Sequence, residues 1–363
     1  LRKMVCMKYI HRLILDKLKS GFMNNRIIII VGSRQVGKTT IMKMYESNIA
    51  KGYKPFYFNL EDATSLGICQ NIDSIRAYLQ DNGVDIEKEK VFLIIDEFHY
   101  IKNATKLFKI FYDLFPFVKV LASGSSSIEI QKHLKESLAG RKRVYNLYPL
   151  NFEEFIRFKN EEEYFRYINL GYQNVSEALI EKYNQDYLED YLVYGGYPKV
   201  ALLRSKTEKI EELQDIYNSY IQKDIKSLLK GEDISSYNNL LKVLSSQVGN
   251  LVNINELSCT LKIGRRQIKK YLNILEQTFI ITLLAPFHAN KRAEISKMPK
   301  LYLLDTGIIN FSLGSFGRID YRPNLGSYIE NFIFSELIKY KPIQYGIYFW
   351  RTKLDNFLFV TGF

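Results

Sequence analysis

Cysteine, tryptophan and histidine are scarce in this chain of 363 residues, which has three Cys, one Trp and four His. The cysteines are Cys6, Cys69 and Cys259, which are far apart and odd in number, so they do not indicate a disulfide framework. The histidines lack the close spacing that zinc ligands have. The sequence therefore gives no support to a protein held together by disulfides or built around a zinc ion.

Long apolar runs are also missing. The longest lie around Ile27 and at residues 279–285, and both are much shorter than the ~20 residues that span a bilayer. Charged residues such as Lys3, Lys8 and Arg12 interrupt the N-terminal segment, which therefore lacks the apolar centre of a secretory signal. We expect a protein of the cytoplasm without a transmembrane helix.

What the chain does contain is typical of a globular protein, with 47% hydrophobic and 25% charged residues. Its length is sufficient for two or three domains. The formal net charge of +12 is a weak indication of an acidic partner, and its distribution along the chain is more informative.

The most informative motif is the phosphate-binding loop G-x-x-x-x-G-K-T, which stands between an apolar run and a predicted helix start. A triphosphate needs many N–H donors with no side chains in the way, and Gly32 and Gly37 permit that approach. Lys38 is expected to reach the β- and γ-phosphates, and the Thr39 hydroxyl to hold Mg²⁺. The expected ATP-binding residues are Gly32, Ser33, Arg34, Gln35, Val36, Gly37, Lys38, Thr39 and Thr40.

A second apolar run, residues 91–95, ends in Asp96 and Glu97. Ionised carboxylates are costly beside a core unless they bind something. Asp96 is expected to contact Mg²⁺ through its water shell, and Glu97 to polarise the attacking water as general base. The alternative is a helix cap with an acidic first turn after a buried strand.

Four short apolar runs are separated by segments of helix length, which predicts a parallel α/β sheet with its ligands at the carboxyl edge. Ser123 or Ser125 would lie beside the γ-phosphate, or would belong to a serine-rich helix cap. The runs are residues 26–31, 55–60, 91–95 and 118–127.

With these motifs the chain resembles the predicted AAA+ superfamily ATPases of bacteria and archaea that carry a C-terminal domain of unknown function. The resemblance extends from about Met7 to Trp350 and implies ATP binding and hydrolysis, without identifying what hydrolysis drives. The strings that carry it, besides the nucleotide motifs, are residues 136–141, 147–155, 194–198, 220–225, 299–307 and 330–332.

The resemblance also implies a helical lid over residues 146–235, of the kind that AAA-type domains place beside the nucleotide. Arg141 and Arg143 are candidates to contact the γ-phosphate, in the same chain or from a neighbouring subunit, because a guanidinium there stabilises transition-state charge. The alternative is a surface arginine next to an edge strand.

Residues 256–284 follow the pattern of a winged helix. A short helix at 256–261, a turn at 262–264 and a second helix at 265–277 precede an apolar wing strand at 279–284. Residues 262–300 hold nine Lys or Arg against two Glu, an excess typical of phosphate contact. The outer face of the second helix is expected to contact DNA through Arg265, Arg266, Lys269 and Lys270, while Ile268, Tyr271, Leu272 and Leu275 face inward. The alternative is a winged helix used only for packing.

The resemblance weakens at the C-terminus. In the family, a helix with the counterpart of Glu330 opens a restriction-endonuclease-like domain whose metal carboxylates follow on strands after a W-R-T-K string. Residues 350–353 match that string, but residues 354–360 depart from the family pattern. Without a second carboxylate and a lysine, two-metal phosphodiester chemistry lacks its ligands, so we expect an incomplete nuclease-like domain without activity.

The sequence thus predicts an AAA-type P-loop ATPase domain at residues 1–145, a helical lid at 146–235, a winged helix at 236–290 and a partial nuclease-like domain at 291–363. The function we expect is an Mg²⁺-dependent ATPase that acts as a conformational switch, on DNA or a protein partner, and an oligomer is one option. The alternative is a nucleotide-gated DNA- or protein-binding regulator with little turnover. A P-loop kinase is disfavoured because Glu97 beside Asp96 suits activation of water.

Overall fold

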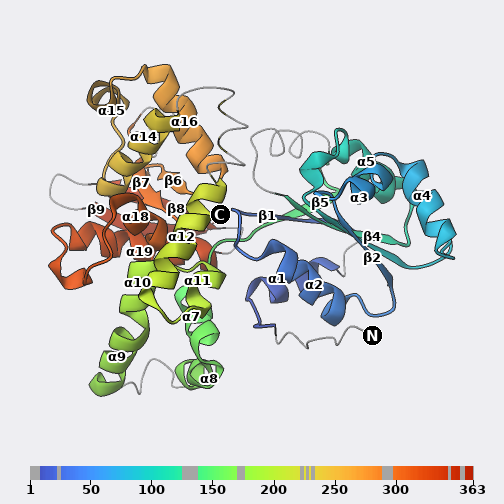
Figure 1. Cartoon of the computed structure of the whole chain (residues 1–363), viewed down its shortest axis with the longest axis horizontal. Helices are drawn as coiled ribbons and strands as arrows, with labels where there is room; N and C mark the ends of the chain where they lie inside the picture. Colours follow the sequence, from blue (N-terminus) through green and yellow to red (C-terminus); the bar gives the residue numbers. More distant parts are fainter. Residues whose placement is uncertain are drawn as a thin grey trace. The chain divides into compact units, whose positions relative to one another are not determined.

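The structure is a computed structural model of the whole chain, and it forms two compact units, residues 1–147 and 148–363 (Figure 1). It describes residues 9–22, 26–124, 138–169, 176–220, 225, 229, 234–287, 297–341, 345–351 and 356–362. None of the helices in these ranges is long and apolar enough to cross a membrane.

The first unit is built on a five-stranded parallel sheet with the order β2-β3-β4-β1-β5. The four predicted strands are confirmed, and the fifth strand joins at the edge beside β1. The strands are β1 (Ile27–Val31), β2 (Lys54–Asn59), β3 (Val91–Asp96), β4 (Val118–Gly124) and β5 (Lys142–Asn146).

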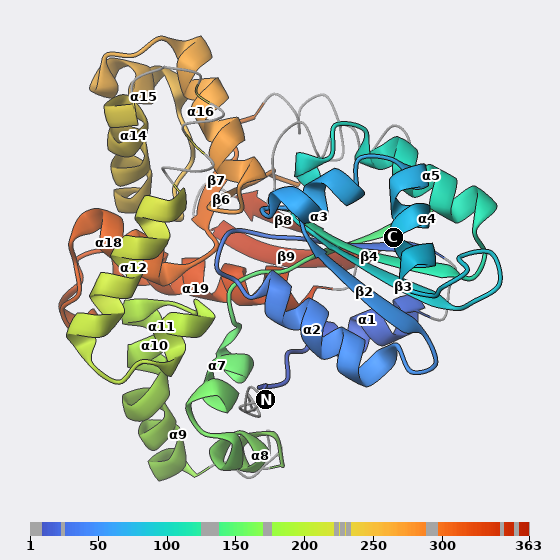
Figure 2. The same ribbon diagram turned by 45° about the vertical axis from the view of Figure 1, so that its right-hand side comes forward.

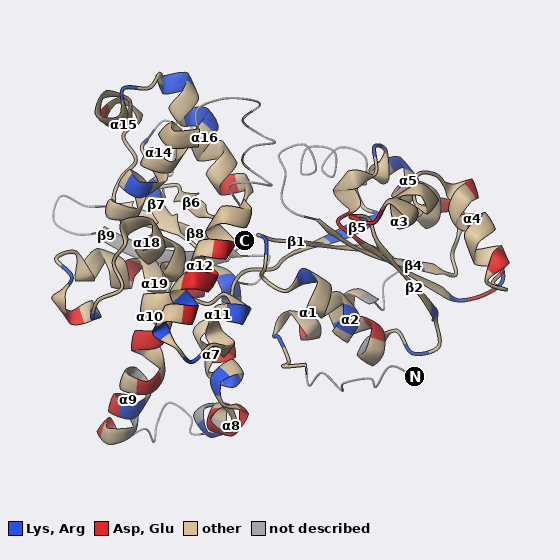
Figure 3. Cartoon of the chain, in the orientation of Figure 1, with Lys and Arg blue, Asp and Glu red and all other residues tan. Residues whose placement is uncertain are grey.

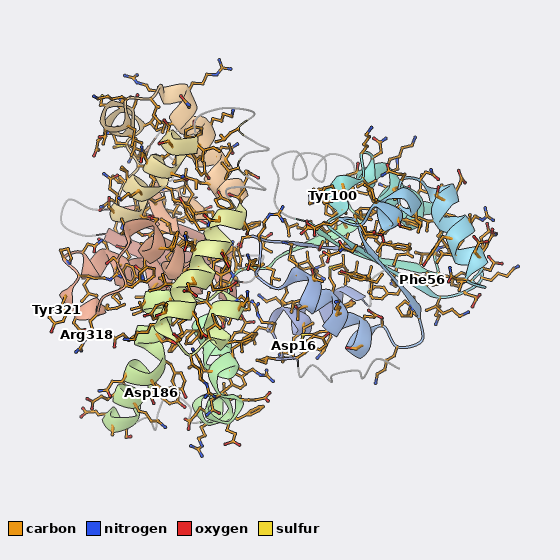
Figure 4. All side chains as sticks on the ribbon, viewed as in Figure 1. Asp16, Phe56, Tyr100, Asp186, Arg318 and Tyr321 are labelled. Atoms are coloured by element: carbon orange, nitrogen blue, oxygen red, sulfur yellow. The ribbon has the colours of Figure 1, made fainter. Side chains whose placement is uncertain are left out.

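Helices cover both faces of this sheet, with α1 and α2 on one face and α3, α4 and α5 on the other (Figures 1 and 2). Their side chains fill the space on both sides of the strands (Figure 4). The helices are α1 (Ile14–Phe22), α2 (Lys38–Ile49), α3 (Ala63–Ile68), α4 (Ile72–Asp81) and α5 (Ala104–Leu114), with a 3₁₀ turn η1 (Phe98–Tyr100).

The central strands are apolar because helices cover both faces of the sheet. Every residue of β1 and of β3 is buried, and a strand that is buried on both faces has no polar face to alternate with. The strand β2 lies at the edge of the sheet and leaves Lys54, Pro55, Tyr57 and Asn59 exposed. The carboxyl ends of all five strands lie at one edge, where the loop after β1 and the acidic pair after β3 meet.

The described residues of the second unit are mostly helical, and the two small sheets among them are antiparallel. The sheets consist of β6 (Ile281–Leu284) with β7 (Lys300–Leu303), and β8 (Tyr345–Arg351) with β9 (Asn356–Gly362). The helices are α7 (Phe152–Lys159), α8 (Glu161–Asn169), α9 (Glu177–Tyr183), η2 (Asn184–Leu188), α10 (Glu189–Tyr194), α11 (Pro198–Leu202), α12 (Lys206–Tyr220), α14 (Ile234–Ser246), α15 (Ile254–Leu261), α16 (Arg265–Gln277), α18 (Thr306–Leu313), η4 (Ile319–Tyr321) and α19 (Leu325–Tyr340).

Residues 148–363 form one compact unit, which contains nearly all of the segments expected as a lid at 146–235, a winged helix at 236–290 and a partial nuclease-like domain at 291–363. Those domain boundaries stay predictions. Asp305 is fully buried and accepts hydrogen bonds from the backbone N–H groups of Gly196 (2.8 Å) and Ile308 (3.2 Å). Asn310 donates to the carbonyls of Leu192 and Val193. Buried polar groups need such partners, so the helical segment and the C-terminal helices depend on each other for their hydrogen bonds.

These contacts explain two of the strings that carry the family resemblance. A Cβ at Gly196 would lie 2.3 Å from the Leu150 carbonyl oxygen, and one at Gly307 would lie 2.3 Å from the Tyr194 carbonyl oxygen. Glycine is needed at both positions because the backbones approach too closely for any side chain. The strings at 194–198 and 299–307 therefore form close backbone contacts within the second unit.

Candidate nucleotide-binding site

The phosphate-binding loop connects the carboxyl end of β1 to the start of α2. Gly37 is the residue before the helix and has φ 95° and ψ 25°, a left-handed conformation that favours glycine. Gln35 also has a positive φ, of 61°. The first N–H groups of α2 have no partner within the helix, and the helix dipole adds partial positive charge there, so the loop end suits a phosphate.

Gly32 has a further reason to be glycine that the sequence did not indicate. An added Cβ would lie 2.2 Å from the carbonyl oxygen of Leu147, which follows β5. The Leu147 N–H in turn donates to the Val31 carbonyl at 2.7 Å. The start of the loop is thus packed against the chain that leaves the edge strand, and a side chain at 32 would separate them.

Lys38 is buried at the first position of α2 and folds back over the loop. Its Nζ donates to the carbonyl oxygens of Gly32 and Ser33, both at 3.1 Å, and lies 3.8 Å from Glu97 Oε1. The ammonium group is therefore held directly over the loop whose amides would surround a phosphate. As a point charge with three donors it suits the phosphate oxygens.

Asp96 ends β3 and is almost fully buried. Its Oδ2 accepts hydrogen bonds from Thr39 Oγ1 at 2.6 Å and from the Tyr57 hydroxyl at 2.9 Å, and its Oδ1 accepts a short one from Ser123 Oγ. A hydroxyl and a carboxylate side by side provide the oxygen atoms that Mg²⁺ prefers. Thr39 and Asp96 therefore fit the ion that the sequence predicts here.

Glu97 has φ 58° and ψ 48°, a conformation that costs free energy in a residue other than glycine and recurs at functional sites. Its side chain makes no cap hydrogen bond with η1, so the helix-cap alternative does not account for it. Its carboxylate lies between Lys38 and His99, with 3.1 Å between Oε2 and His99 Nδ1. Its backbone N–H donates to Ser123 Oγ at 3.3 Å.

Other sequence-predicted site residues lie elsewhere. Ser125 lies outside the described residues. Arg141 lies at the amino end of β5, where its carbonyl accepts from Ile27 N–H, and its Nε donates to Asp113 at 2.8 Å. Since the loop follows the opposite end of β1, Arg141 lies at the other edge of the sheet from the loop of its own chain. Arg143 pairs with Ile28, near the same amino end.

Three residues at the site were missed from the sequence. Tyr57 and His99 contact the two acidic side chains, and the buried Arg12 donates from Nη1 to the Val36 carbonyl at 3.1 Å. Tyr57 stands on the same strand face as Asn59, which is level with Asp96 in the sheet. Only the strand register connects Tyr57 to Asp96, and one sequence does not reveal that register.

The helix predicted at 265–277 is confirmed as α16, and so are its two faces. Ile268, Tyr271, Leu272 and Leu275 are buried, while Arg265, Arg266, Lys269, Lys270 and Asn273 are exposed. Figure 3 shows the basic positions along the first half of the helix. Helix α15, a turn with Lys262 in the left-handed region, and α16 precede the β6–β7 pair, and Leu251 forms a bridge with Lys300 of β7.

Glu330, the candidate nuclease carboxylate, is held by protein side chains. It accepts hydrogen bonds from Lys300 Nζ at 2.6 Å and from the Tyr302 hydroxyl at 2.5 Å. Within the described ranges, no group of three His, Cys, Asp or Glu residues is arranged to hold a metal ion.

We expect no Mg²⁺- or Mn²⁺-dependent DNA cleavage that depends on Glu330, because Lys300 and Tyr302 hold its carboxylate and two-metal chemistry needs further carboxylates. Nicking of supercoiled plasmid is the measurement, with Glu330→Ala as the comparison. Cleavage by the parent that disappears in this variant would show that the prediction is wrong.

A parallel sheet with a phosphate-binding loop after β1 and an acidic pair at the end of β3 is the arrangement of a P-loop nucleotide-binding domain. Residues 24–156 match the family model described as AAA domain, and residues 185–318 match a Domain of unknown function (DUF8612). The first unit thus contains a segment similar to AAA domains, and the second contains a segment similar to a domain of unknown function.

Curated relatives resemble the chain over most of its length. An uncharacterized protein of Methanocaldococcus jannaschii is 29% identical over 320 residues, which is 86% of this chain and 66% of the relative. One of Haemophilus influenzae is 24% identical over 324 residues, 86% of this chain and 74% of the relative. The chain thus spans about two thirds to three quarters of the length of these relatives.

Among solved structures, the Thermotoga maritima RuvB Holliday junction branch migration motor is 17% identical, with a TM-score of 0.31. The match covers 76% of this chain and 90% of that one.

Proposed function

We propose that the protein is a Mg²⁺-dependent ATPase that acts as a conformational switch. The observation that supports this best is that Lys38, Thr39, Asp96 and Glu97 lie together at the carboxyl edge of the sheet. The loop and α2 bind the phosphates, Lys38 neutralises the β- and γ-phosphates, and Thr39 and Asp96 hold the Mg²⁺ ion. The ion supplies positive charge that offsets the charge on the phosphate oxygens.

Glu97 then acts as the general base. The oxygen of a water molecule attacks the γ-phosphorus, and the bond to the bridging oxygen of ADP breaks. The proton of the water goes to the Glu97 carboxylate, and ADP and phosphate leave. Glu97 suits this role because its side chain lies within 3.8 Å of Lys38, beside the place where the γ-phosphate would lie.

Lys38→Ala is expected to weaken ATP binding at least tenfold, because the charge-assisted hydrogen bonds to the β- and γ-phosphates are lost. Titration with a fluorescent ATP analogue measures this. Lys51→Ala, which removes an exposed lysine just after the end of α2, should bind as the parent does. Equal affinity in Lys38→Ala and the parent would contradict the phosphate role of Lys38.

The alternative, a nucleotide sensor with little turnover, differs in its rate of hydrolysis. Steady-state release of phosphate from ATP, with and without duplex DNA, separates the two functions. A switch hydrolyses ATP repeatedly, whereas a sensor binds ATP and stops. Transfer of the γ-phosphate to an acceptor instead of water would favour the kinase alternative.

DNA is the partner that the second unit favours. The arrangement of α15, the turn, α16 and the β6–β7 pair supports a winged helix, and the basic face of α16 suits the phosphates of a duplex. We propose that Arg265, Arg266, Lys269 and Lys270 contact DNA. If these four residues do not contact DNA, we propose a protein as the partner instead.

Arg141 retains one proposed role, contact with the γ-phosphate from a neighbouring subunit. Native mass with and without ATP tests whether ATP promotes oligomers. The helical lid beside the nucleotide, the partial nuclease-like domain and the cytoplasmic location stay predictions.

A further inference from the structure

Three hydroxyl groups converge on the Asp96 carboxylate, each from a different element. Thr39 comes from α2, Tyr57 from β2 and Ser123 from β4. A carboxylate has about four acceptor positions, two on each oxygen. Both positions of Oδ2 and one of Oδ1 are taken, which leaves one position on Oδ1.

We propose that Tyr57 is a positioning residue of the magnesium site, fixing Asp96 so that one acceptor position of its carboxylate faces a Mg²⁺-bound water. This inference rests on the proposed function and adds to it a residue outside the usual loop and acidic pair. Thr39 and Tyr57 hold Oδ2 from two sides, so rotation of the carboxylate would break both hydrogen bonds.

Strand pairing fixes the position of Tyr57, since β2 and β3 are level from Lys54 and Val91 to Asn59 and Asp96. The Tyr57 hydroxyl donates its hydrogen bond to Asp96 Oδ2 from this fixed position.

The test is the Mg²⁺ dependence of nucleotide binding in Tyr57→Phe, which removes the hydroxyl and keeps the ring. Outer partners of metal ligands typically change metal affinity 10- to 100-fold, so the Mg²⁺ concentration for half-maximal tight binding of a fluorescent ATP analogue should rise about tenfold. Binding in EDTA should stay at the parent value, because the loop and Lys38 hold the phosphates. Ser123→Ala should give a shift in the same direction.

Tyr53→Phe is the matched control, since Tyr53 precedes β2 at the opposite end of the strand. Melting temperatures of all variants show whether they fold. An unchanged or lowered Mg²⁺ requirement in folded Tyr57→Phe would overturn the inference, as would an equal loss of affinity in EDTA, which marks a purely structural role. A parent that binds no nucleotide would refute the proposed function itself, and the inference with it.

Discussion

Glu97→Gln is expected to lower the rate of ATP hydrolysis by roughly 10²–10⁴-fold, the contribution typical of a positioned general base. The amide keeps the shape of the side chain and cannot take the proton of the attacking water. ATP binding should persist, because Lys38 and the loop hold the phosphates. Single-turnover hydrolysis and equilibrium binding, measured on the same sample, separate the two effects.

Glu87→Gln is a suitable control for this experiment, since Glu87 forms an ion pair with Arg76 on the surface of the same unit. It should hydrolyse ATP at the parent rate. If Glu97→Gln did so too, Glu97 would not be the base, and its left-handed backbone would need another explanation.

Changing Arg265, Arg266, Lys269 and Lys270 together to Ala is expected to remove the DNA affinity of the second unit. If each residue neutralises one phosphate, the slope of log affinity against log salt concentration should become less steep by about 3.6. The salt-dependent fall in affinity between 50 and 200 mM salt should therefore be smaller by a factor of roughly 150. Fluorescence anisotropy with two unrelated duplexes measures it, and the loss should be similar on both, because phosphate contacts carry no sequence information.

The variant should fold, because all four side chains are exposed and surface substitutions usually cost within about 0.5 kcal/mol each. A variant with Arg204, Lys206 and Lys242 changed to Ala removes exposed charge elsewhere in the same unit and should keep most of the salt dependence. An unchanged salt dependence in the folded α16 variant, or a parent that does not bind DNA in low salt, would favour a packing role for the helix and a protein partner.

The parts of the fold that the sequence predicted are those with a strong local pattern. Strand β1 is a run of β-branched residues, and α16 alternates its apolar and basic residues with the period of a helix. The fifth strand, β5, was not among the four predicted strands and entered only as the edge strand in the alternative for Arg141 and Arg143. It has only one buried residue, Tyr145, because it lies at the edge, so it lacks the apolar run that identified the others.

The site was predictable where a motif fixes the chemistry and not where distant segments meet. Lys38, Thr39 and Asp96 belong to motifs whose spacing reflects one loop and one strand end. Arg12 and Tyr57 reach the site through the tertiary fold. Arg12 contacts Val36, which lies 24 positions further along the chain, and Tyr57 contacts Asp96, which lies 39 positions further along. Arg141 was placed near the phosphates on family resemblance alone, and the direction of β5 puts it at the wrong end of the sheet for its own chain.

The contact between Arg12 and the Val36 carbonyl bears on how the AAA domain should be isolated. The family match begins at residue 24, yet a guanidinium from residue 12 supports the middle of the loop. A fragment trimmed to the matched boundary would leave that carbonyl without its donor and α2 without α1, whose Leu18 carbonyl accepts from Tyr45. Weak nucleotide binding by such a fragment would reflect where it was cut and would say nothing about the intact protein.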